Sequence, residues 1–368
     1  MSTVVETAII GGGLSGLFAA HLLERQGRDY VLFEARERFG GRIISLPSND
    51  ANQANVDLGP SWYWPNINPR LSALVTSLEI MSYKQFSSGR YLIEETRGAP
   101  AQAIDIGQDI MPDTYRLRGG MQALINGLLK KIRSEQCFLG TPVKTVSKQS
   151  DNTYLLEYEH RGGKGALVAK HVVFAMPLRL ISNTISFHPA LSPALKRSFD
   201  GTETWMAAHA KVVLTYATPF WRDKGFSGSA SSRVGPMVEI HDASPENDQA
   251  EPEYGALMGF IGINGAARKT AGDGTLKRLI LQQAAKLFGP EAQHPLSIEY
   301  VDWYQETFTS TTNDLSASHG IYGIDIEDIE HPHIFFAGTE ASHSFGGYLE
   351  GALDAASLAV NAITSLSH

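Results

Sequence analysis

Apolar positions near the start of the chain follow two different periods. In "TAIIGGGLSGLFAAHLLERQG" an unbroken apolar run is followed by three glycines, and then by apolar positions at helical spacing. A second apolar run, "YVLFEARE", comes next. The pattern predicts a buried strand, a glycine turn, a helix and a second strand, which together form the βαβ unit of an α/β fold.

Further along the chain, segments with helical periodicity and segments with a strand-like pattern are both present. It predicts helices over 70–78, in "GGMQALINGLLKKIRS", in "GTLKRLILQQAAKLFG" and from Tyr348 onward. Strands are predicted in "TPVKTVSK", "NTYLLEYEH", "LVAKHVVFAMP", "AHAKVVLTYATPFW", "PMVEIHD", "YGALMGFIG" and "LSIEYVDWY". The segment 87–112 has no sustained period and predicts an irregular insertion. We therefore expect α/β elements at both ends and a mixed sheet with helices in the middle.

Composition narrows the class of protein. A chain of 368 residues with 43% hydrophobic content has room for two domains. A net charge of −8 argues against a nucleic-acid partner. No apolar run reaches membrane-spanning length and the N-terminus lacks a signal-peptide pattern, so we expect a cytoplasmic protein without a membrane partner. Cys137 is the single cysteine, which excludes an internal disulfide.

The glycine turn at the start has the spacing of a dinucleotide-binding motif. Gly11, Gly13 and Gly16 would supply the tight turn, the close approach to a pyrophosphate and the helix–strand packing. Glu34 ends the second predicted strand, where a carboxylate can accept hydrogen bonds from ribose hydroxyls. The alternative is a glycine turn that binds no ligand. The strand before the turn, the helix after it and the acidic residue favour the nucleotide site.

Three more segments carry candidate chemistry. Arg36 and Arg42 flank a glycine pair in "EARERFGGRI", which suits phosphate binding better than solvated surface arginines would. Lys211 lies inside an apolar strand, where an unpaired ammonium is costly. A strand lysine whose head group reaches solvent is the alternative. Near the C-terminus, "FFAGTEASHSFGGYLEGALDAA" predicts a strand, a glycine-rich turn and a helix whose first N–H groups are free to face a ligand.

In combination, these segments resemble the flavin-containing amine oxidases of the monoamine oxidase type. The motifs occur in the family's order: "GGGLSG", "EARERFGGR", "VDLGPSWYWP", "TPVKTV", "AKVVLTYATPFW", "DWYQE" and "FFAGTEASHSFGGYLEGA". The resemblance covers nearly the whole chain. It implies a discontinuous Rossmann-type FAD-binding domain over 1–83, 115–190 and 306–368, and a substrate domain over 84–114 and 191–305.

The resemblance also implies roles for individual residues. Lys211 matches the lysine that holds a water near flavin N5 and assists reoxidation, and Tyr348 matches one aromatic wall of the substrate cage. The residues it implies for FAD binding are Gly11, Gly13, Ser15, Gly16, Glu34, Arg36, Gly41, Arg42, Gly59, Ser61, Trp62, Val143, Trp303, Gly338, Thr339, Glu340, Gly347 and Leu349. Trp64, Thr312 and Asn313 are assigned to the substrate cavity.

The chain departs from the family's pattern in three places. The second cage aromatic is missing, since Asn313 stands at its position. The position of the cysteine that joins covalently to flavin in some relatives falls near Thr312, so we expect FAD to be bound non-covalently. The long helical insertion of typical members is reduced to the segment 84–118, which predicts a more open substrate site.

The expected reaction is the oxidation of a small-molecule amine to an imine and then an aldehyde, with hydride transfer from the α-carbon to flavin N5. A second dinucleotide motif is absent from the sequence, so we expect O2 to be the electron acceptor and H2O2 the product. The alternatives are a flavin desaturase or protoporphyrinogen-oxidase-like dehydrogenase with a non-amine substrate, and a flavin-binding protein without turnover. We expect no metal, because His331 and His333 are typical of surface residues before a strand. Whether the chain forms a homodimer stays open.

Overall fold

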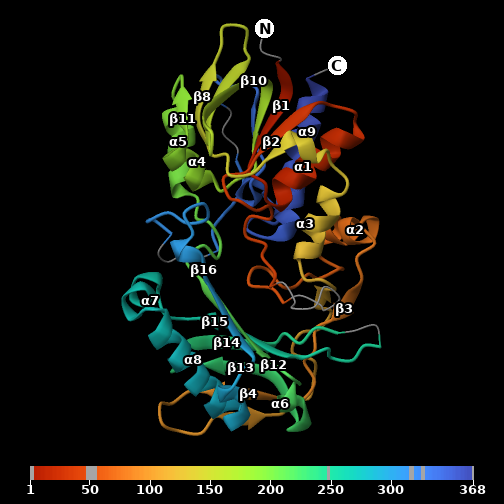
Figure 1. The fold of residues 1–368 in the computed structure, drawn as a ribbon, viewed down its shortest axis with the longest axis vertical. Helices are drawn as coiled ribbons and strands as arrows, with labels where there is room; N and C mark the ends of the chain where they lie inside the picture. The colour runs from red at the N-terminus through yellow and green to blue at the C-terminus, as the bar shows by residue number, and fades with distance from the viewer. Residues whose placement is uncertain (1–3, 47–55, 247–248, 315–318, 325–327, 367–368) are drawn as a thin grey trace.

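The computed structural model describes residues 4–46, 56–246, 249–314, 319–324 and 328–366. They form two lobes stacked along the long axis of the molecule, each built on one large sheet (Figure 1). The upper lobe contains the first strand, β1 (Val5–Ile10), and the last helix, α9 (Leu349–Ser365). The lower lobe contains the middle of the chain, so the two distant ends of the sequence build one lobe together.

The predicted βαβ unit is present at the centre of the upper lobe. Strand β1 lies parallel to both β2 (Tyr30–Phe33) and β10 (Gly163–Phe174), and α1 (Leu14–Arg25) connects β1 to β2. The sheet has the order β11-β8-β9-β10-β1-β2-β7, and β17 pairs with β10. The other strands are β7 (Cys137–Phe138), β8 (Val143–Lys148), β9 (Tyr154–His160), β11 (Ser186–His188) and β17 (Ile334–Phe336).

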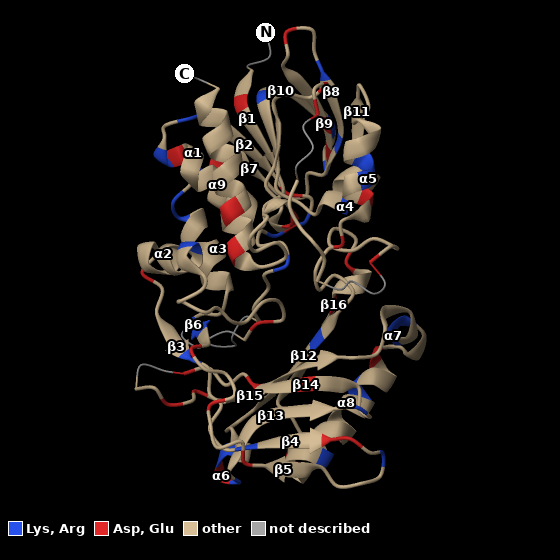
Figure 2. Ribbon diagram, turned by 180° about the vertical axis from the view of Figure 1, so that it is seen from behind, with Lys and Arg blue, Asp and Glu red and all other residues tan. Residues whose placement is uncertain are grey.

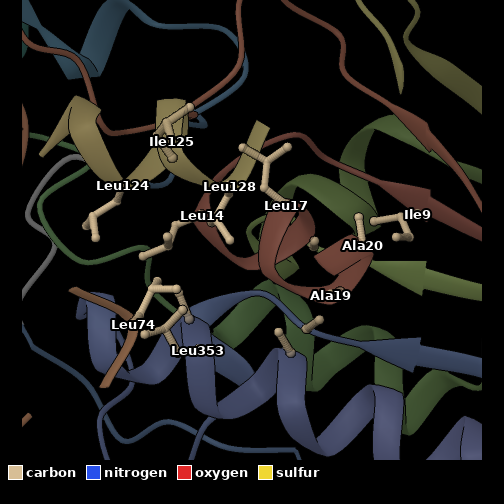
Figure 3. Close-up of a cluster of buried hydrophobic side chains, with 14 of the residues drawn as sticks. Ile9, Leu14, Leu17, Ala19, Ala20, Leu74, Leu124, Ile125, Leu128 and Leu353 are labelled. Atoms are coloured by element: carbon tan, nitrogen blue, oxygen red, sulfur yellow. The ribbon is translucent and has the colours of Figure 1, made fainter. Parts of the chain in front are cut away.

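Helices cover the upper sheet and bury its apolar side chains. The helices besides α1 and α9 are α2 (Pro69–Ser77), α3 (Gln122–Leu129), α4 (Leu178–Thr184) and α5 (Pro193–Gly201). Leu14 and Leu17 of α1 meet Leu124 and Leu128 of α3 in one core, which Leu353 of α9 completes (Figure 3). This core fixes the N-termini of α1 and α9 relative to each other, and the candidate site lies in front of them.

The lower lobe is a sheet of seven strands in the order β16-β12-β15-β14-β13-β4-β5. All neighbours are antiparallel except β13 and β4. The strands are β4 (Arg90–Glu94), β5 (Gln102–Ile104), β12 (Ala210–Tyr216), β13 (Phe226–Ser232), β14 (Met237–Asp242), β15 (Gly255–Ile261) and β16 (Ser297–Asp302). A two-stranded antiparallel sheet between the lobes pairs β3 (Ser82–Lys84) with β6 (Tyr115–Leu117) (Figure 1).

The lower sheet has two different faces. Helix α8 (Asp273–Phe288) packs on one face against Val212 and Leu214 of β12. The neighbouring α7 (Gly265–Ala271) precedes it and α6 (Phe220–Asp223) lies at the far end (Figure 1). Because side chains alternate along a strand, Lys211 and Val213 point to the other face, toward the upper lobe. The short 3-10 turns are Ser134–Gln136, Pro290–Gln293, Trp303–Gln305 and Thr339–Ala341.

The expectation of an irregular insertion over 87–112 was wrong. Strands β4 and β5 extend the lower sheet there, and β4 pairs with β13, a strand that the sequence did not predict. The run "FSGSASS" lacks an apolar alternation, yet Ser227 and Ser229 are buried. Gly228 cannot carry a side chain without a shift, because a Cβ there would meet the indole of Trp221. The segment 84–118 carries these strands and no helix, as the reduced insertion implied.

Helix α5 and His331 lie elsewhere than the sequence predicted. Helix α5 lies within 191–305, the segment assigned to the substrate domain, but its Leu195 and Phe199 pack in the core beneath the upper sheet. Helix α5 thus packs across the predicted boundary between 115–190 and 191–305, and that boundary stays a prediction. His331 is buried rather than on the surface, and its Nε2 lies 2.8 Å from the carbonyl oxygen of Pro189. Among the described residues, no three His, Cys, Asp or Glu side chains gather closely enough to hold a metal ion.

Charges are spread over the molecule. Figure 2 shows basic and acidic residues interspersed on both lobes. Within the described part of the chain, no helix has the length and apolar character needed to cross a bilayer.

A buried carboxylate ties α9 to α2. Glu350 accepts hydrogen bonds from the N–H groups of Arg70 and Leu71, both at 2.9 Å, and so caps the start of α2. We expect Glu350→Gln to lower the free energy of unfolding by about 1–2 kcal/mol, because an amide can satisfy only one of the two donors. Urea unfolding measures the change. Glu299→Gln, at an exposed side chain of β16, is the matched control. Equal destabilisation by both variants would contradict the capping role.

Candidate functional site

One cavity of about 530 Å³ lies between the two lobes and is lined by both. It extends from the glycine turn after β1 to the face of the lower sheet that carries Lys211. Strand ends and helix N-termini of an α/β sheet meet at such an edge, where ligands commonly bind. Segments that are hundreds of residues apart in the sequence therefore contribute to one site.

The glycine turn has the geometry that its spacing predicted. Gly11 has a φ of +112°, and a Cβ there would meet the carbonyl of Ala175. A Cβ at Gly16 would meet the carbonyl of Gly11, so this glycine allows the helix to pack on the strand. Gly13 is different. A Cβ there would approach only Gly41 Cα, at 3.9 Å, so the missing side chain leaves open space in the cavity.

The N-terminus of α1 faces the cavity without a side-chain cap. Its N-cap residue is Gly13, and no acidic residue lies in the first turn. Ser15, in that turn, donates its hydroxyl to the carbonyl of Ala337, which ties the two ends of the chain together. Free N–H groups and the positive end of the helix dipole make this point suitable for an anion such as a pyrophosphate.

Glu34 lies at the end of β2, buried against the glycine turn. Its carboxylate accepts hydrogen bonds from the N–H of Gly12 at 2.7 Å and from the N–H of Arg36 at 2.8 Å. The two donors hold the carboxylate beside the turn and on the cavity wall. A ribose at this position would find an oriented acceptor.

The two predicted arginines have different partners. The Arg36 guanidinium donates to Thr309 Oγ1 at 2.7 Å and lies 5.6 Å from the centre of the Phe308 ring. Arg42 forms an ion pair of 2.9 Å with Glu340. Glu340 is fully buried, and its second oxygen, Oε2, has no hydrogen-bond partner among the described residues. A buried carboxylate oxygen without a donor is costly, so a ligand hydroxyl is the natural partner for it.

Helix α9 begins beside the same cavity. Its N-cap residue is Tyr348, whose side chain makes no capping bond, and its carbonyl accepts from the hydroxyl of Thr339 at 2.7 Å. The acidic residue of the first turn, Glu350, accepts hydrogen bonds from the N–H groups of α2 and does not cap α9. Gly347 has a φ of +86° and lets the chain pass close to Trp205. The positive end of α9 is therefore directed at the cavity.

Lys211 lies at the bottom of the cavity and is 3% exposed. Its Nζ donates to the carbonyl of Gly59 at 2.9 Å and to Ser61 Oγ at 2.5 Å, and it lies 5.6 Å from the centre of the Phe260 ring. No carboxylate forms an ion pair with it among the described residues. Burial lowers the pKa of Lys211 to about 7, although the negative charge of Asp57 opposes the shift. The alternative of a lysine reaching into solvent is excluded.

Tyr348 does not face the residues expected opposite it. Tyr348 is 44% exposed, and its ring lies 5.2 Å from the ring of His319, which in turn is 5.2 Å from the ring of Trp205. Thr312 and Asn313 are exposed and are not part of the cavity wall. The structure thus places Tyr348 at the cavity but does not bring these two residues to it.

Most of the predicted residues are brought together. The cavity wall contains Gly11, Gly13, Ser15, Glu34, Arg36, Gly41, Arg42, Gly59, Ser61, Trp62, Trp64, Val143, Lys211, Trp303, Gly338, Thr339, Gly347, Tyr348 and Leu349. Gly16 and Glu340 lie outside the lining and support it through Gly11 and Arg42.

Other wall residues were not predicted. Met176 and Pro177 follow β10, Trp205 and His209 precede β12, and Phe260 lies on β15. The end of an apolar strand in "VVFAMP" was a usable signal for the first pair, because ligands bind beyond strand ends. Phe260 had no such signal, since its position opposite Lys211 depends on strand pairing.

Comparison with known proteins agrees with this arrangement. The sequence profile of the family "flavin containing amine oxidoreductase" matches residues 68–364, and that of NAD(P)-binding Rossmann-like domains matches residues 9–78. Human flavin-containing amine oxidase B is 25% identical over 99% of this chain and 86% of its own length. Putrescine oxidase of Kocuria rosea is 26% identical over 87% of this chain and 86% of its own length.

Two solved structures share the fold over the whole length of both chains. A wild-type putrescine oxidase bound to putrescine superposes with a TM-score of 0.80 at 18% identity. Cyclohexylamine oxidase from Brevibacterium oxydans superposes with a TM-score of 0.81 at 20% identity. The family profile covers most of the chain and includes Lys211 and the whole C-terminal motif. The chain therefore belongs to the flavin-containing amine oxidoreductases, the flavoenzymes that act on amines.

Proposed function

We propose that the protein binds FAD non-covalently and oxidises a small amine, with O2 as the electron acceptor. The observation that carries this proposal is the single cavity that joins the dinucleotide turn, the N-terminus of α9 and the buried Lys211. Each feature would serve a dinucleotide flavin: the turn as a phosphate site, the helix dipole as a stabiliser of negative charge, and the lysine as a cationic hydrogen-bond donor.

The residues in place fit FAD. Space at Gly13 and free N–H groups of α1 suit the pyrophosphate, and Glu34 suits the adenosine ribose. The unpartnered Oε2 of Glu340 offers an acceptor to a ribityl hydroxyl. Cys137 lies on β7 and is not part of the cavity wall, and burial raises the pKa of its thiol to about 11. The chain's one thiol is therefore poorly suited to a covalent flavin link.

The bound flavin would supply the redox chemistry, taking hydride from the amine α-carbon and passing electrons to O2 to give H2O2. The chain's own residues would position the cofactor and the amine and would stabilise the charge that develops during the reaction. The N-terminus of α9 would stabilise negative charge that the bound cofactor gains on reduction. Lys211 would offer the bound cofactor a proton and a hydrogen-bond donor for water from the cavity wall. Tyr348 presents an aromatic face to an incoming amine.

The substrate site is expected to be open to a range of amines. The segment 84–118 contributes β4 and β5 to the lower sheet and supplies no helix above the cavity. Proteins similar to this chain carry the names of monoamine, putrescine and cyclohexylamine oxidases, so the shared substrate property is an amine group.

We expect the purified protein to be yellow and to release its FAD on acid precipitation. It should produce H2O2 with at least one amine in a panel of primary, secondary and aromatic amines. We expect kcat/KM to rise with pH as the amine loses its proton. Flavin that stays with the precipitated polypeptide would contradict non-covalent binding. Reduction by a non-amine, with transfer to a quinone but not to O2, would select the dehydrogenase alternative.

A further inference from the structure

Residues 306–314, which we call the strap, contribute to the cavity wall. Residues 307–309 line the cavity directly. At the end of the strap, Asp314 is fully buried and forms an ion pair of 2.5 Å with Arg179 of α4. The same carboxylate accepts hydrogen bonds from the N–H and the hydroxyl of Thr311, at 2.7 and 2.8 Å. A buried carboxylate with these donors fixes this end of the strap.

Arg36 joins the other end of the strap to Glu34. Its guanidinium donates to Thr309 Oγ1 at 2.7 Å and lies 3.4 Å from Glu306 Oε2. The same guanidinium lies 4.0 Å from Glu34 Oε1. Glu34 is the carboxylate that suits the adenosine ribose. The strap therefore lies at the part of the cavity where the adenosine end of FAD would bind.

The start of β8 lies beside the same residues. The N–H of Thr141 donates to the carbonyl of Glu34, and the N–H of Gly140 donates to the carbonyl of Arg36, both at 2.8 Å. Residues 141–144 all line the cavity. The segment after β2 thus contacts the strap through its side chains and the start of β8 through its backbone. Three segments that are distant in the sequence form this part of the cavity wall.

Phe308 is the large apolar side chain that the strap contributes to this wall. It is 38% exposed, and the guanidinium of Arg36 lies 5.6 Å from the centre of its ring. A guanidinium over an aromatic face is an attractive contact, which favours one orientation of the ring. Aromatic rings and guanidinium planes are also the groups on which nucleobases stack, because every base has a π-face.

We propose that Phe308, held by Arg36, is the platform against which the adenine of FAD stacks, and that the strap retains the cofactor through this contact. Thr312 and Asn313 belong to the same strap but are not part of the cavity wall, so they do not share this role. The inference rests on the proposed binding of FAD. It adds the residue that holds the adenine.

The test measures binding of FAD and of ADP, which carries the adenosine diphosphate half of the cofactor and no flavin. Phe308→Ala should raise the dissociation constants of the full-length chain for FAD and for ADP by the same factor, about tenfold or more. Release of FAD from the holoenzyme, followed by the fluorescence of the freed flavin, should become faster by a similar factor.

Two further variants separate stacking from a structural role. Phe308→Trp keeps an aromatic face and should bind both ligands within about twofold of the wild type. Phe308→Leu keeps apolar volume without a π-face, so it should weaken both ligands even if the alanine variant fails to fold. Circular dichroism checks the fold of each variant.

Phe226→Ala is the matched control, because Phe226 also lies under an arginine, with Arg90 at 4.8 Å, but on β13 of the lower lobe and outside the cavity wall. It should leave both dissociation constants unchanged. Wild-type affinities in Phe308→Leu would overturn the proposal, as would weaker FAD binding with unchanged ADP binding, or a wild-type chain that binds FAD but not ADP. A wild-type chain that binds no FAD would overturn the proposed function itself.

Discussion

Lys211→Met is expected to slow reaction of the reduced enzyme with O2 by about a hundredfold and to change reduction by amine only a few-fold. Electron transfer to O2 creates negative charge, and a preorganised cation in a dry site can be worth this much. Lys211 is buried and has no carboxylate partner in the described chain, so its charge is not neutralised locally. Stopped-flow measurement of each half-reaction separates the two rates.

The lowered pKa of Lys211 gives this effect a pH dependence. Below a pH of about 7 the Lys211 side chain is protonated, and above that pH its amino group is neutral. The reoxidation rate of the wild type should therefore fall as the pH rises through about 7, and that of Lys211→Met should stay flat.

Lys286→Met provides the comparison for Lys211→Met, since Lys286 lies on α8 and pairs with Glu94 away from the cavity. It should leave both half-reactions unchanged. If Lys211→Met slowed both half-reactions equally, the charge would not act on the oxygen reaction specifically, and the assigned role would be lost.

Gly13→Val is expected to produce a folded but colourless protein, with an FAD dissociation constant raised at least about a hundredfold, or about 2.7 kcal/mol. A Cβ at Gly13 meets only Gly41 Cα at 3.9 Å, so the fold should tolerate the side chain. The added atoms would instead occupy the space that the pyrophosphate needs at the N-terminus of α1. Titration of the protein with FAD, followed by fluorescence, measures the change.

Gly274→Val tests whether any glycine replacement has this effect. Gly274 lies on α8, away from the cavity, and a Cβ there meets nothing within 4 Å. Both variants should show wild-type circular dichroism, and only Gly13→Val should lose the flavin. Normal FAD binding by Gly13→Val would mean that the cofactor does not pass close to this turn.

Local pattern was enough to predict most of the elements. The period of two, the period of 3.6 and the glycine turn predicted β1, α1, β2, α8 and α9, because each buries a stripe or face that its own sequence encodes. The strand β13 was missed for the opposite reason. A side chain at its Gly228 would meet the indole of Trp221, and this contact between segments leaves no local period in the sequence.

The same division applies to the site. Glu34 and the glycine turn were recognisable because their function depends on short-range geometry, namely a turn and the strand that follows it. The position of Phe260 beside Lys211 depends on which strands pair and in what register. A shift of one residue in that register would move these side chains to the opposite face of the sheet.

The sequence alone determined the dinucleotide turn, the free helix N-terminus at Tyr348 and the presence of a lysine in an apolar strand. Only the tertiary structure decided that these three features meet in one cavity, that Lys211 is buried without an ion-pair partner among the described residues, and that Thr312 and Asn313 lie outside the cavity wall. The physical reason is that backbone conformation follows from neighbours along the chain. Burial, and with it the charge state of a lysine, follows from the packing of distant segments.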